Sequence, residues 1–194
     1  MGGSTGVTSK LVWIDCEMTG LDVYNDRILE LACFVTTWDL TPVEPNGMEE
    51  VIYCPPEVLD QMDDWCKAQH SQSGLVARVL ASSMTAAKVE AKLLKYLRDE
   101  CGIIERNSGV LAGNSVHMDK EFLRREMPQL LAYLNYRVID VSTLKELSRR
   151  RNPSVYVSAP VKKNRHTAKS DILESIEELR HYYETFLITD MPDK

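Results

Sequence analysis

Two carboxylate residues stand one position apart near the start of the chain. Asp15 and Glu17 close a short apolar run that begins at Leu11. Successive side chains of a β-strand point to opposite faces, so residues two apart point the same way and can share one hard cation. Adjacent carboxylates repel each other and resist burial unless a cation lies between them. The spacing therefore indicates half of a metal site, with a solvated strand end before the turn at Gly20 as the alternative.

Three more residues of metal-binding or proton-transferring type lie at junctions between predicted elements. Asp119 follows a short apolar strand, whereas His166 and Asp171 lie at the start of the last helix. Active sites in α/β proteins gather at such junctions, so these residues can meet the first pair. Each also has a structural explanation, because an aspartate in a first helical turn interacts with the helix dipole and a histidine among basic residues suits an exposed loop.

These junctions require a mixed sheet flanked by helices. Apolar runs and period-two alternation predict strands at residues 11–15, 27–38, 50–54, 110–113 and 136–141. The first three have links short enough for an antiparallel meander, and the later strands alternate with helices. Helical periodicity predicts helices at residues 75–80, 85–100, 120–127, 143–150 and 171–186. Thr143 and Glu146 have capping-box spacing for the fourth helix, which stops near Pro153.

Length and composition fit one globular domain. A chain of 194 residues can bury a sizeable core, and a composition of 44% hydrophobic and 27% charged residues argues against disorder. We expect the domain to span residues 11–188, between a flexible lead or cloning remnant at 1–10 and a tail at 189–194. The net charge of −6 argues against wrapping of long duplexes by a broad basic surface, but it allows a short nucleic acid at one focused site.

Cysteine use and hydropathy indicate an intracellular protein. The five cysteines are odd in number and lack C-x-x-C spacing, so neither a disulfide framework nor a zinc site is indicated. Cys16 should face the core, because strand geometry turns it away from the two carboxylates. No apolar run approaches the roughly 20 residues that cross a bilayer. We expect a soluble protein with no membrane association, located in the cytoplasm, with the mitochondrion as the alternative.

Five stretches of sequence, in order, resemble a known group of nucleases. The D-C-E at 15–17, Asp119 after a G-N-S turn, and H-x-A-x-x-D at 166–171 resemble the DEDD exonuclease superfamily in its histidine-bearing (DEDDh) branch. D-C-E-M-T-G-L-D at 15–22, M-D-D-W at 62–65, the residues at 73–75 and 111–115, and D-V-S-T-L-K-E-L at 140–147 together resemble the oligoribonuclease family within it. The resemblance extends from Leu11 to the last predicted helix.

That resemblance implies an RNase H-like fold and a hydrolase that removes nucleotides from the 3′ end of very short RNA, often dinucleotides. The implied ligands of two Mg²⁺ or Mn²⁺ ions, which prefer oxygen, are Asp15, Glu17, Asp119 and Asp171, with Asp15 bridging both ions. Two cations about 3.5 to 4 Å apart activate the attacking water and stabilise the leaving oxygen. His166 is implied as the general base, because the ordinary imidazole pKa of about 6.5 lies near neutrality.

The resemblance also assigns residues that hold the substrate. Leu21 matches the family's wedge between two bases, Trp65 matches its stacking platform, and Ser115 matches a contact to the terminal nucleotide. Met18 belongs to the same substrate-binding set. The residues that match a cap on the 5′ phosphate, some of them reaching in from the second subunit of a homodimer, are His70, Tyr136, Arg137 and Ser142. The alternatives are core roles for Leu21 and Trp65, a plain turn for Ser115 and a surface charge for Arg137.

Basic residues near the last helix and two departures from the family pattern bear on this prediction. Two basic groups would either attract RNA or form a solvated face, namely Arg149, Arg150 and Arg151, and then Lys162, Lys163 and Arg165. Relatives usually carry an apolar and then an acidic residue before the last metal aspartate, where this chain has Lys169 and Ser170. The metal site is therefore expected to lack one nearby negative charge.

Two other functions stay open at this point. A related exonuclease of wider range would trim DNA or longer RNA, and a series of RNA lengths separates it from an enzyme for dinucleotides. A non-catalytic nucleic-acid-binding module would leave the carboxylates idle, so chelation or Asp15→Ala would change nothing. The presence of all five catalytic residue types favours an exoribonuclease that releases nucleoside 5′-monophosphates.

Overall fold

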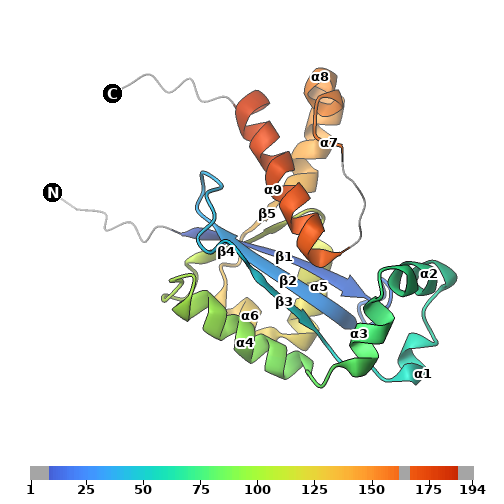
Figure 1. The fold of residues 1–194 in the computed structure, drawn as a ribbon. Coiled ribbons are helices and arrows are strands. Elements are labelled where there is room, and N and C mark those ends of the chain that lie inside the picture. Colours follow the sequence, from blue (N-terminus) through green and yellow to red (C-terminus); the bar gives the residue numbers. More distant parts are fainter. Residues whose placement is uncertain (1–8, 162–166, 188–194) are drawn as a thin grey trace.

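A five-stranded sheet runs through the part of the chain that the computed structural model describes, residues 9–161 and 167–187 (Figure 1). Its strands are β1 (Lys10–Met18), β2 (Ile28–Thr36), β3 (Met48–Val51), β4 (Gly109–Gly113) and β5 (Val138–Asp140). The order across the sheet is β3-β2-β1-β4-β5. The first three strands are antiparallel, β4 is parallel to β1 and β5 is parallel to β4. The predicted α/β fold with a mixed sheet is confirmed.

Helices cover both faces of the sheet. Within the described ranges they are α1 (Pro56–Leu59), α2 (Asp64–Gln72), α3 (Leu75–Ala81), α4 (Ala86–Asp99), α5 (Val116–Glu126), α6 (Pro128–Tyr133), α7 (Val141–Arg151), α8 (Pro153–Val157) and α9 (Ala168–Thr185). Figure 1 shows α4 and α6 on one side of the sheet and α7 and α9 on the other. The helices α1, α2 and α3 form a small lobe beside the end of β1.

The side chains of β1 divide between the two helical layers. Val12 and Cys16 belong to the core beneath α4, α5 and α6, whereas Trp13 packs with residues of α9. Because the side chains of a strand alternate, Asp15 and Glu17 continue the face that Trp13 begins, which is the α9 side. Cys16 is 8% exposed, so its predicted core position is confirmed. All five cysteines are buried and none is in a disulfide.

The central strand pairs with its two neighbours over different lengths. With β2 the pairing continues to Met18, whereas with β4 it ends at Trp13, opposite Ala112. The chain then leaves β4 and turns at Asn114 and Ser115 into α5. The second half of β1 therefore has no strand on its β4 side within the described residues, and the first turn of α5 lies there instead.

Several element boundaries differ from the sequence prediction. The helix expected at 120–127 begins at Val116, because Ser115 adopts a left-handed φ of 51° directly after β4 and starts the helix early. The predicted capping box is wrong. The carboxylate of Asp140, which ends β5, accepts a 3.0 Å hydrogen bond from the Ser142 N–H and starts α7 at Val141. The strands expected at 50–54 and 136–141 occupy 48–51 and 138–140.

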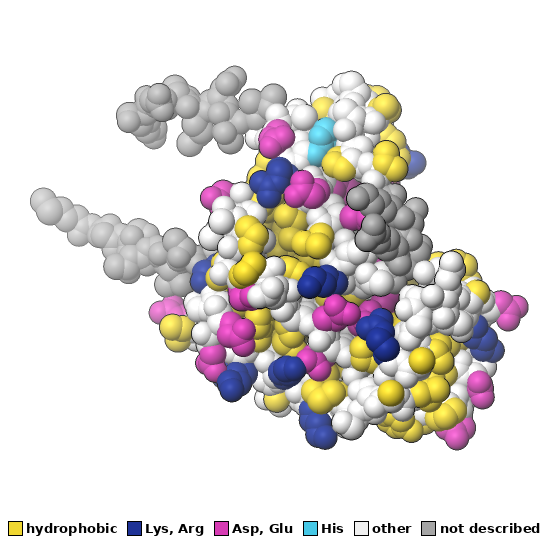
Figure 2. Space-filling view, in the orientation of Figure 1, with side chains coloured by type: hydrophobic (Ala, Val, Ile, Leu, Met, Phe, Trp, Pro, Cys, Tyr) yellow, Lys and Arg dark blue, Asp and Glu magenta, His cyan; other side chains and the backbone are white. Residues whose placement is uncertain are grey.

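Charges of both signs are interspersed on the face shown in Figure 2, where Asp and Glu side chains alternate with Lys and Arg. This face is therefore not the broad basic surface that wrapping of a long duplex requires. None of the helices in the described ranges has the length and apolar character that crossing a membrane demands.

Candidate active site

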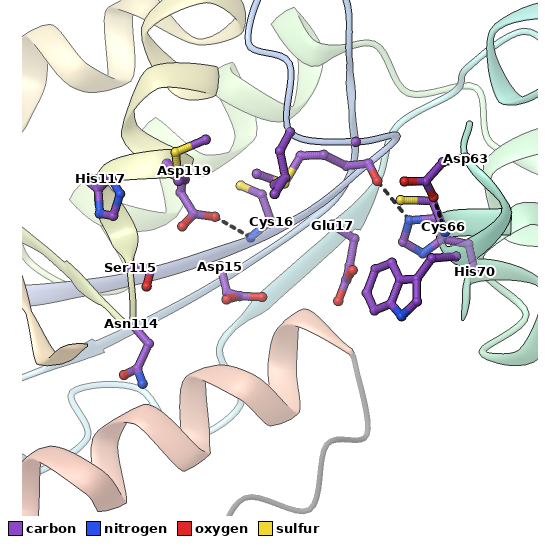
Figure 3. Close-up of a pocket in the computed structure, with 15 residues that line it drawn as sticks. Asp15, Cys16, Glu17, Asp63, Cys66, His70, Asn114, Ser115, His117 and Asp119 are labelled. Atoms are coloured by element: carbon purple, nitrogen blue, oxygen red, sulfur yellow. Dashed lines mark hydrogen bonds between the residues drawn. The ribbon is translucent and has the colours of Figure 1, made fainter. Parts of the chain in front are cut away.

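Three carboxylates from the two ends of the chain converge beside the end of β1. Asp15 and Glu17 come from β1 and Asp171 comes from the first turn of α9. Each offers an oxygen within 4.8 Å of an oxygen of the other two. Figure 3 shows the carboxylates of Asp15 and Glu17 on the same side of β1, pointing toward the helix below them. The predicted pair thus shares one face and meets a third carboxylate there.

Asp119 approaches the same strand from the opposite direction. It lies in the first turn of α5 and is only 6% exposed. Its Oδ1 accepts a 3.0 Å hydrogen bond from the backbone N–H of Cys16, the residue between the two carboxylates of β1 (Figure 3). Among the described residues Asp119 does not belong to the close group of three, but it lines the same pocket as Asp15 and Glu17. The helix-dipole role is compatible with this position, because Asp119 is in a first turn.

Two of these carboxylates, Glu17 and Asp119, resist ionisation. Burial, reinforced first by the charge of Asp171, raises the pKa of Glu17 from 4.5 to about 7. Burial also raises the pKa of Asp119 from 3.8 to about 7, although the hydrogen bond from Cys16 lowers it. Carboxylates crowded in this way are the ligand set of a hard divalent cation, which supplies the missing positive charge. The donor atoms present therefore fit a divalent metal.

A pocket of about 630 Å³ opens beside these carboxylates. Leu21 is 72% exposed and Trp65 is 63% exposed, so the alternative of core roles for these two residues is wrong. The pocket is lined by Asp15, Cys16, Glu17, Met18, Gly20, Leu21, Asp63, Trp65, Cys66, His70, Asn114, Ser115, His117, Met118 and Asp119. The pocket thus combines acidic groups with exposed apolar side chains.

Helix α2 positions two of the predicted substrate residues. The side chain of Asp63 accepts a 2.7 Å hydrogen bond from the Cys66 N–H, which caps the helix and fixes its first turn. Trp65 projects from that turn. His70, one turn from the end of α2, is buried, and its Nε2 donates a 2.8 Å hydrogen bond to the carbonyl of Met18. The hydrogen bond joins α2 to the end of β1.

The residues matched to a phosphate cap fall into two places. The Ser115 N–H donates to Asp140 Oδ1 at 2.9 Å and lies 3.0 Å from the Ser142 Oγ, so the two serines meet at the rim of the pocket. Tyr136 and Arg137 do not line the pocket, and the Arg137 guanidinium stacks 4.6 Å from the centre of the Tyr136 ring. Tyr136 is 71% exposed. Of the four residues matched to the cap, therefore, His70 lines the pocket and Ser142 contacts its lining through Ser115, whereas Tyr136 and Arg137 lie outside the lining.

Sequence reasoning missed a buried group that supports the pocket wall. The Nδ2 of Asn114 donates a 2.8 Å hydrogen bond to Glu178, a residue of α9 that is 3% exposed. Glu178 also accepts from the Tyr182 hydroxyl at 3.1 Å and lies 3.5 Å from the Lys145 ammonium. Asn114 stood within the G-N-S turn, but Glu178 carried no signal beyond a polar position in a predicted helix. His117, also missed, lines the pocket 3.2 Å from Asp140.

Some predicted residues lie elsewhere. His166, Lys162, Lys163 and Arg165 lie outside the described residues. Arg149 and Arg150 both pair with Glu146 on α7, as a solvated face predicts. The Nζ of Lys169 donates to the carbonyl of Asn46 at 3.1 Å, and Ser170 hydrogen-bonds to Thr167 at the start of α9.

Comparisons with known proteins agree with this geometry. A family model described as an exonuclease matches residues 12–179. The mitochondrial oligoribonuclease of Saccharomyces cerevisiae is 48% identical over 189 residues, which cover 94% of this chain and 70% of that protein. An oligoribonuclease of Neisseria meningitidis is 46% identical, with 93% of this chain and 94% of that protein covered.

Among solved structures, E. coli exonuclease I in complex with a dT13 oligonucleotide superimposes with a TM-score of 0.65 at 12% sequence identity, over 93% of this chain. This chain spans only 42% of that longer protein, and the likeness shows a shared fold, the RNase H-like one that the sequence predicts. The family model and the oligoribonucleases give the closer relationship. The chain therefore belongs to the exonuclease family and, within it, to the oligoribonucleases.

Proposed function

We propose that the protein is a two-metal 3′-to-5′ exoribonuclease that hydrolyses short oligoribonucleotides, dinucleotides above all, to nucleoside 5′-monophosphates. The observation that carries this proposal is the group formed by Asp15, Glu17 and Asp171, two of which line a pocket that also presents exposed Leu21 and Trp65. Similarity to proteins named oligoribonucleases over nearly the whole chain supports the same activity.

The carboxylates Asp15, Glu17, Asp119 and Asp171 would hold Mg²⁺ or Mn²⁺, because every donor is an oxygen. When bound, the cations neutralise the phosphodiester and stabilise charge on the attacking and leaving oxygens. Asp119, hydrogen-bonded to Cys16, keeps its carboxylate in a fixed orientation against β1. His166 is proposed as the group that takes the proton of the attacking water, the role that suits an imidazole near neutral pH.

The pocket accounts for a short substrate. Met18, Leu21 and Trp65, which line the same pocket, would contact the bases, since aromatic stacking on a base tolerates any sequence. Ser115, Ser142 and His70 would face the sugar and phosphate. Tyr136 and Arg137 lie outside this pocket. We propose that, in a homodimer, they reach the partner subunit's site and complete the cap on the 5′ phosphate of the RNA bound there. Such a cap would reward a terminal phosphate and block longer chains.

The location proposed is intracellular. The yeast relative is named a mitochondrial protein and the Neisseria relative is bacterial, so the family as represented here does not single out one compartment. We propose the cytoplasm, with the mitochondrion as the alternative. Fractionation of cells that carry the tagged full-length protein decides between them.

A length series tests the proposed activity. 5′-labelled RNAs of graded length, beginning with a dinucleotide, are incubated with Mn²⁺ or with chelator, and a DNA series is run in parallel. We expect the dinucleotide to react fastest, chelator to stop the reaction, and Asp15→Asn to lose activity while the exposed Glu105→Gln keeps it. Dinucleotides that react no faster than long RNA or DNA would support the exonuclease of wider range. Activity that survives both chelator and Asp15→Asn would contradict the proposed site.

A further inference from the structure

The loop that carries Leu21 between β1 and β2 is held in a defined shape. The carboxylate of Asp26 accepts a 2.7 Å hydrogen bond from the Thr19 hydroxyl and a 2.8 Å hydrogen bond from the Asp22 N–H, so it ties the two ends of the loop together. A Cβ placed on Gly20 would collide with the Asp26 carboxylate, so a larger residue there would displace this carboxylate. Leu21 stands between Gly20 and Asp22, inside the fixed segment.

The C-terminal end of α5 binds the other side of this loop. Arg125 donates through one guanidinium nitrogen to the carbonyl of Val23 and through another to the carbonyl of Asp26. Its neighbour Glu126, whose side chain is 4% exposed, accepts from Arg125 at 2.6 Å and from the Arg27 Nε at 3.0 Å. The loop carbonyls thus find their donors on a helix, because the antiparallel ladder between β1 and β2 has ended.

The same helix carries a predicted metal ligand at its other end. Asp119 lies in the first turn of α5 and Arg125 six positions later, which is about 9 Å along a helix axis. Asp119 binds the end of β1 through Cys16, and Arg125 binds the loop that follows β1. One rigid helix therefore fixes the distance between the acidic group and the exposed side chain of Leu21.

We infer that Arg125, supported by Glu126, is a positioning residue for the substrate, because it holds the 20–27 loop in the form that presents Leu21 to the bases. The inference rests on the proposed function, in which Leu21 contacts the substrate. Arg125 is 30% exposed at its side chain and does not line the pocket, so it acts through the loop and not by direct contact. A lysine could not replace it, since one ammonium cannot reproduce two donors at the fixed spacing of a guanidinium.

Arg124 is a matched control. It is the preceding residue of the same helix and carries the same charge. Its side chain is 61% exposed and, within the described part of the chain, pairs only with Glu121. The test compares Arg125→Ala, Arg125→Lys and Arg124→Ala in the full-length enzyme. It measures kcat and KM on a 5′-phosphorylated diribonucleotide, and hydrogen exchange of the loop amides. Leu21→Ala is made alone and together with Arg125→Ala.

Arg125→Ala and Arg125→Lys should both raise KM about tenfold with little change in kcat, since orientation of the bases is lost while the carboxylates stay in place. Arg124→Ala should match wild type. The amides of Tyr24 and Asp26, both hydrogen-bonded in the loop, should exchange about tenfold faster in both Arg125 variants. In the Leu21→Ala background Arg125→Ala should add less than about twofold, because its effect passes through Leu21.

Three results would overturn the inference. Loop amides that exchange at the wild-type rate in both Arg125 variants would show that Arg125 does not hold the loop. A full additional loss in the Leu21→Ala background, or restoration of KM by Arg125→Lys, would show that it acts by charge or by another route. Leu21→Ala could also leave KM unchanged while the loop amides still exchange faster in the Arg125 variants. That result would rule out the substrate role of Leu21 but would confirm that Arg125 holds the loop.

Discussion

Replacement of Glu17 by glutamine separates what this carboxylate does to the metal-free protein from what it does when a cation is bound. Burial, together with the nearby charge of Asp171, raises the pKa of Glu17 from 4.5 to about 7. Glutamine has nearly the same shape without the charge. In the presence of chelator, therefore, Glu17→Gln should make the protein more stable while it damages the metal site.

The size of the effect follows from the pKa. The folded state binds a proton that the unfolded chain releases, so stability falls as pH rises from 4.5 toward 7. Each tenfold change in an ionisation constant corresponds to about 1.4 kcal/mol. The ionised carboxylate thus lowers the free energy of unfolding by about 3 kcal/mol at pH 8, and by less than about 1 kcal/mol at pH 5. Glu17→Gln should recover about 2 to 3 kcal/mol at the higher pH.

Urea unfolding at pH 5 and pH 8, with chelator or with Mn²⁺, measures both effects. In chelator the variant should exceed wild type at pH 8, and the gap should shrink at pH 5. With Mn²⁺ the advantage of the variant should disappear. A ligand at a hundred times its dissociation constant stabilises the folded wild type by about 2.7 kcal/mol, which is about the size of that advantage, and the variant lacks one donor. Glu105→Gln, which removes an exposed carboxylate, should change neither comparison. A variant no more stable than wild type at pH 8 in chelator, or a gap that is the same at both pH values, would refute the reasoning.

Three further predictions concern single side chains. Asp171→Asn should lower kcat on a dinucleotide at least about a hundredfold, whereas the exposed Glu177→Gln on the same helix should leave it unchanged; equal activity of the two variants would contradict the metal group. Trp65→Ala should raise KM about tenfold, because stacking on one base is worth about 1 to 3 kcal/mol. Trp38→Phe, which changes an exposed tryptophan outside the pocket lining, should leave KM at the wild-type value. A KM unaffected by loss of Trp65 would rule out the stacking platform. Glu178→Ala removes the buried acceptor shared by Asn114, Tyr182 and Lys145, of which Tyr182 is itself buried, and should lower the free energy of unfolding in urea by about 2 to 4 kcal/mol. Glu178→Gln should fall in between. A loss below about 1 kcal/mol would show that the group is not cooperative.

The sequence predicted those parts of the site that depend on local periodicity. Asp15 and Glu17 share a face because a strand repeats every two residues, and this holds whatever the rest of the fold does. The last helix was predicted from its apolar spacing, and that helix brings Asp171 to the first pair. The position of Asp119 at the end of a predicted strand made it a candidate, whereas family resemblance alone added Leu21 and Trp65.

Long-range contacts could not be predicted in this way. The bond between Asn114 and Glu178 joins residues 64 positions apart, and either residue alone is an ordinary polar side chain. The start of α7 was misplaced because two capping signals competed, and the carboxylate at the end of β5 lies closer to the strand than the Thr143 hydroxyl does. The grip of Arg125 on the loop after β1 is likewise invisible in sequence, since Arg124 beside it has the same charge and no such contact.

Pairing between β1 and β4 ends at Trp13, and this limits insertions that would lengthen β4. Past Trp13 the N–H of Cys16 points to where another residue of β4 would lie, and the carboxylate of Asp119 takes that hydrogen bond instead. The Cys16 N–H can therefore bond either to a longer β4 or to the aspartate of α5, but not to both. A longer β4 would continue pairing with β1 and displace Asp119 from its hydrogen bond to Cys16. The position at which β4 ends therefore determines the space that is left for Asp119 beside β1.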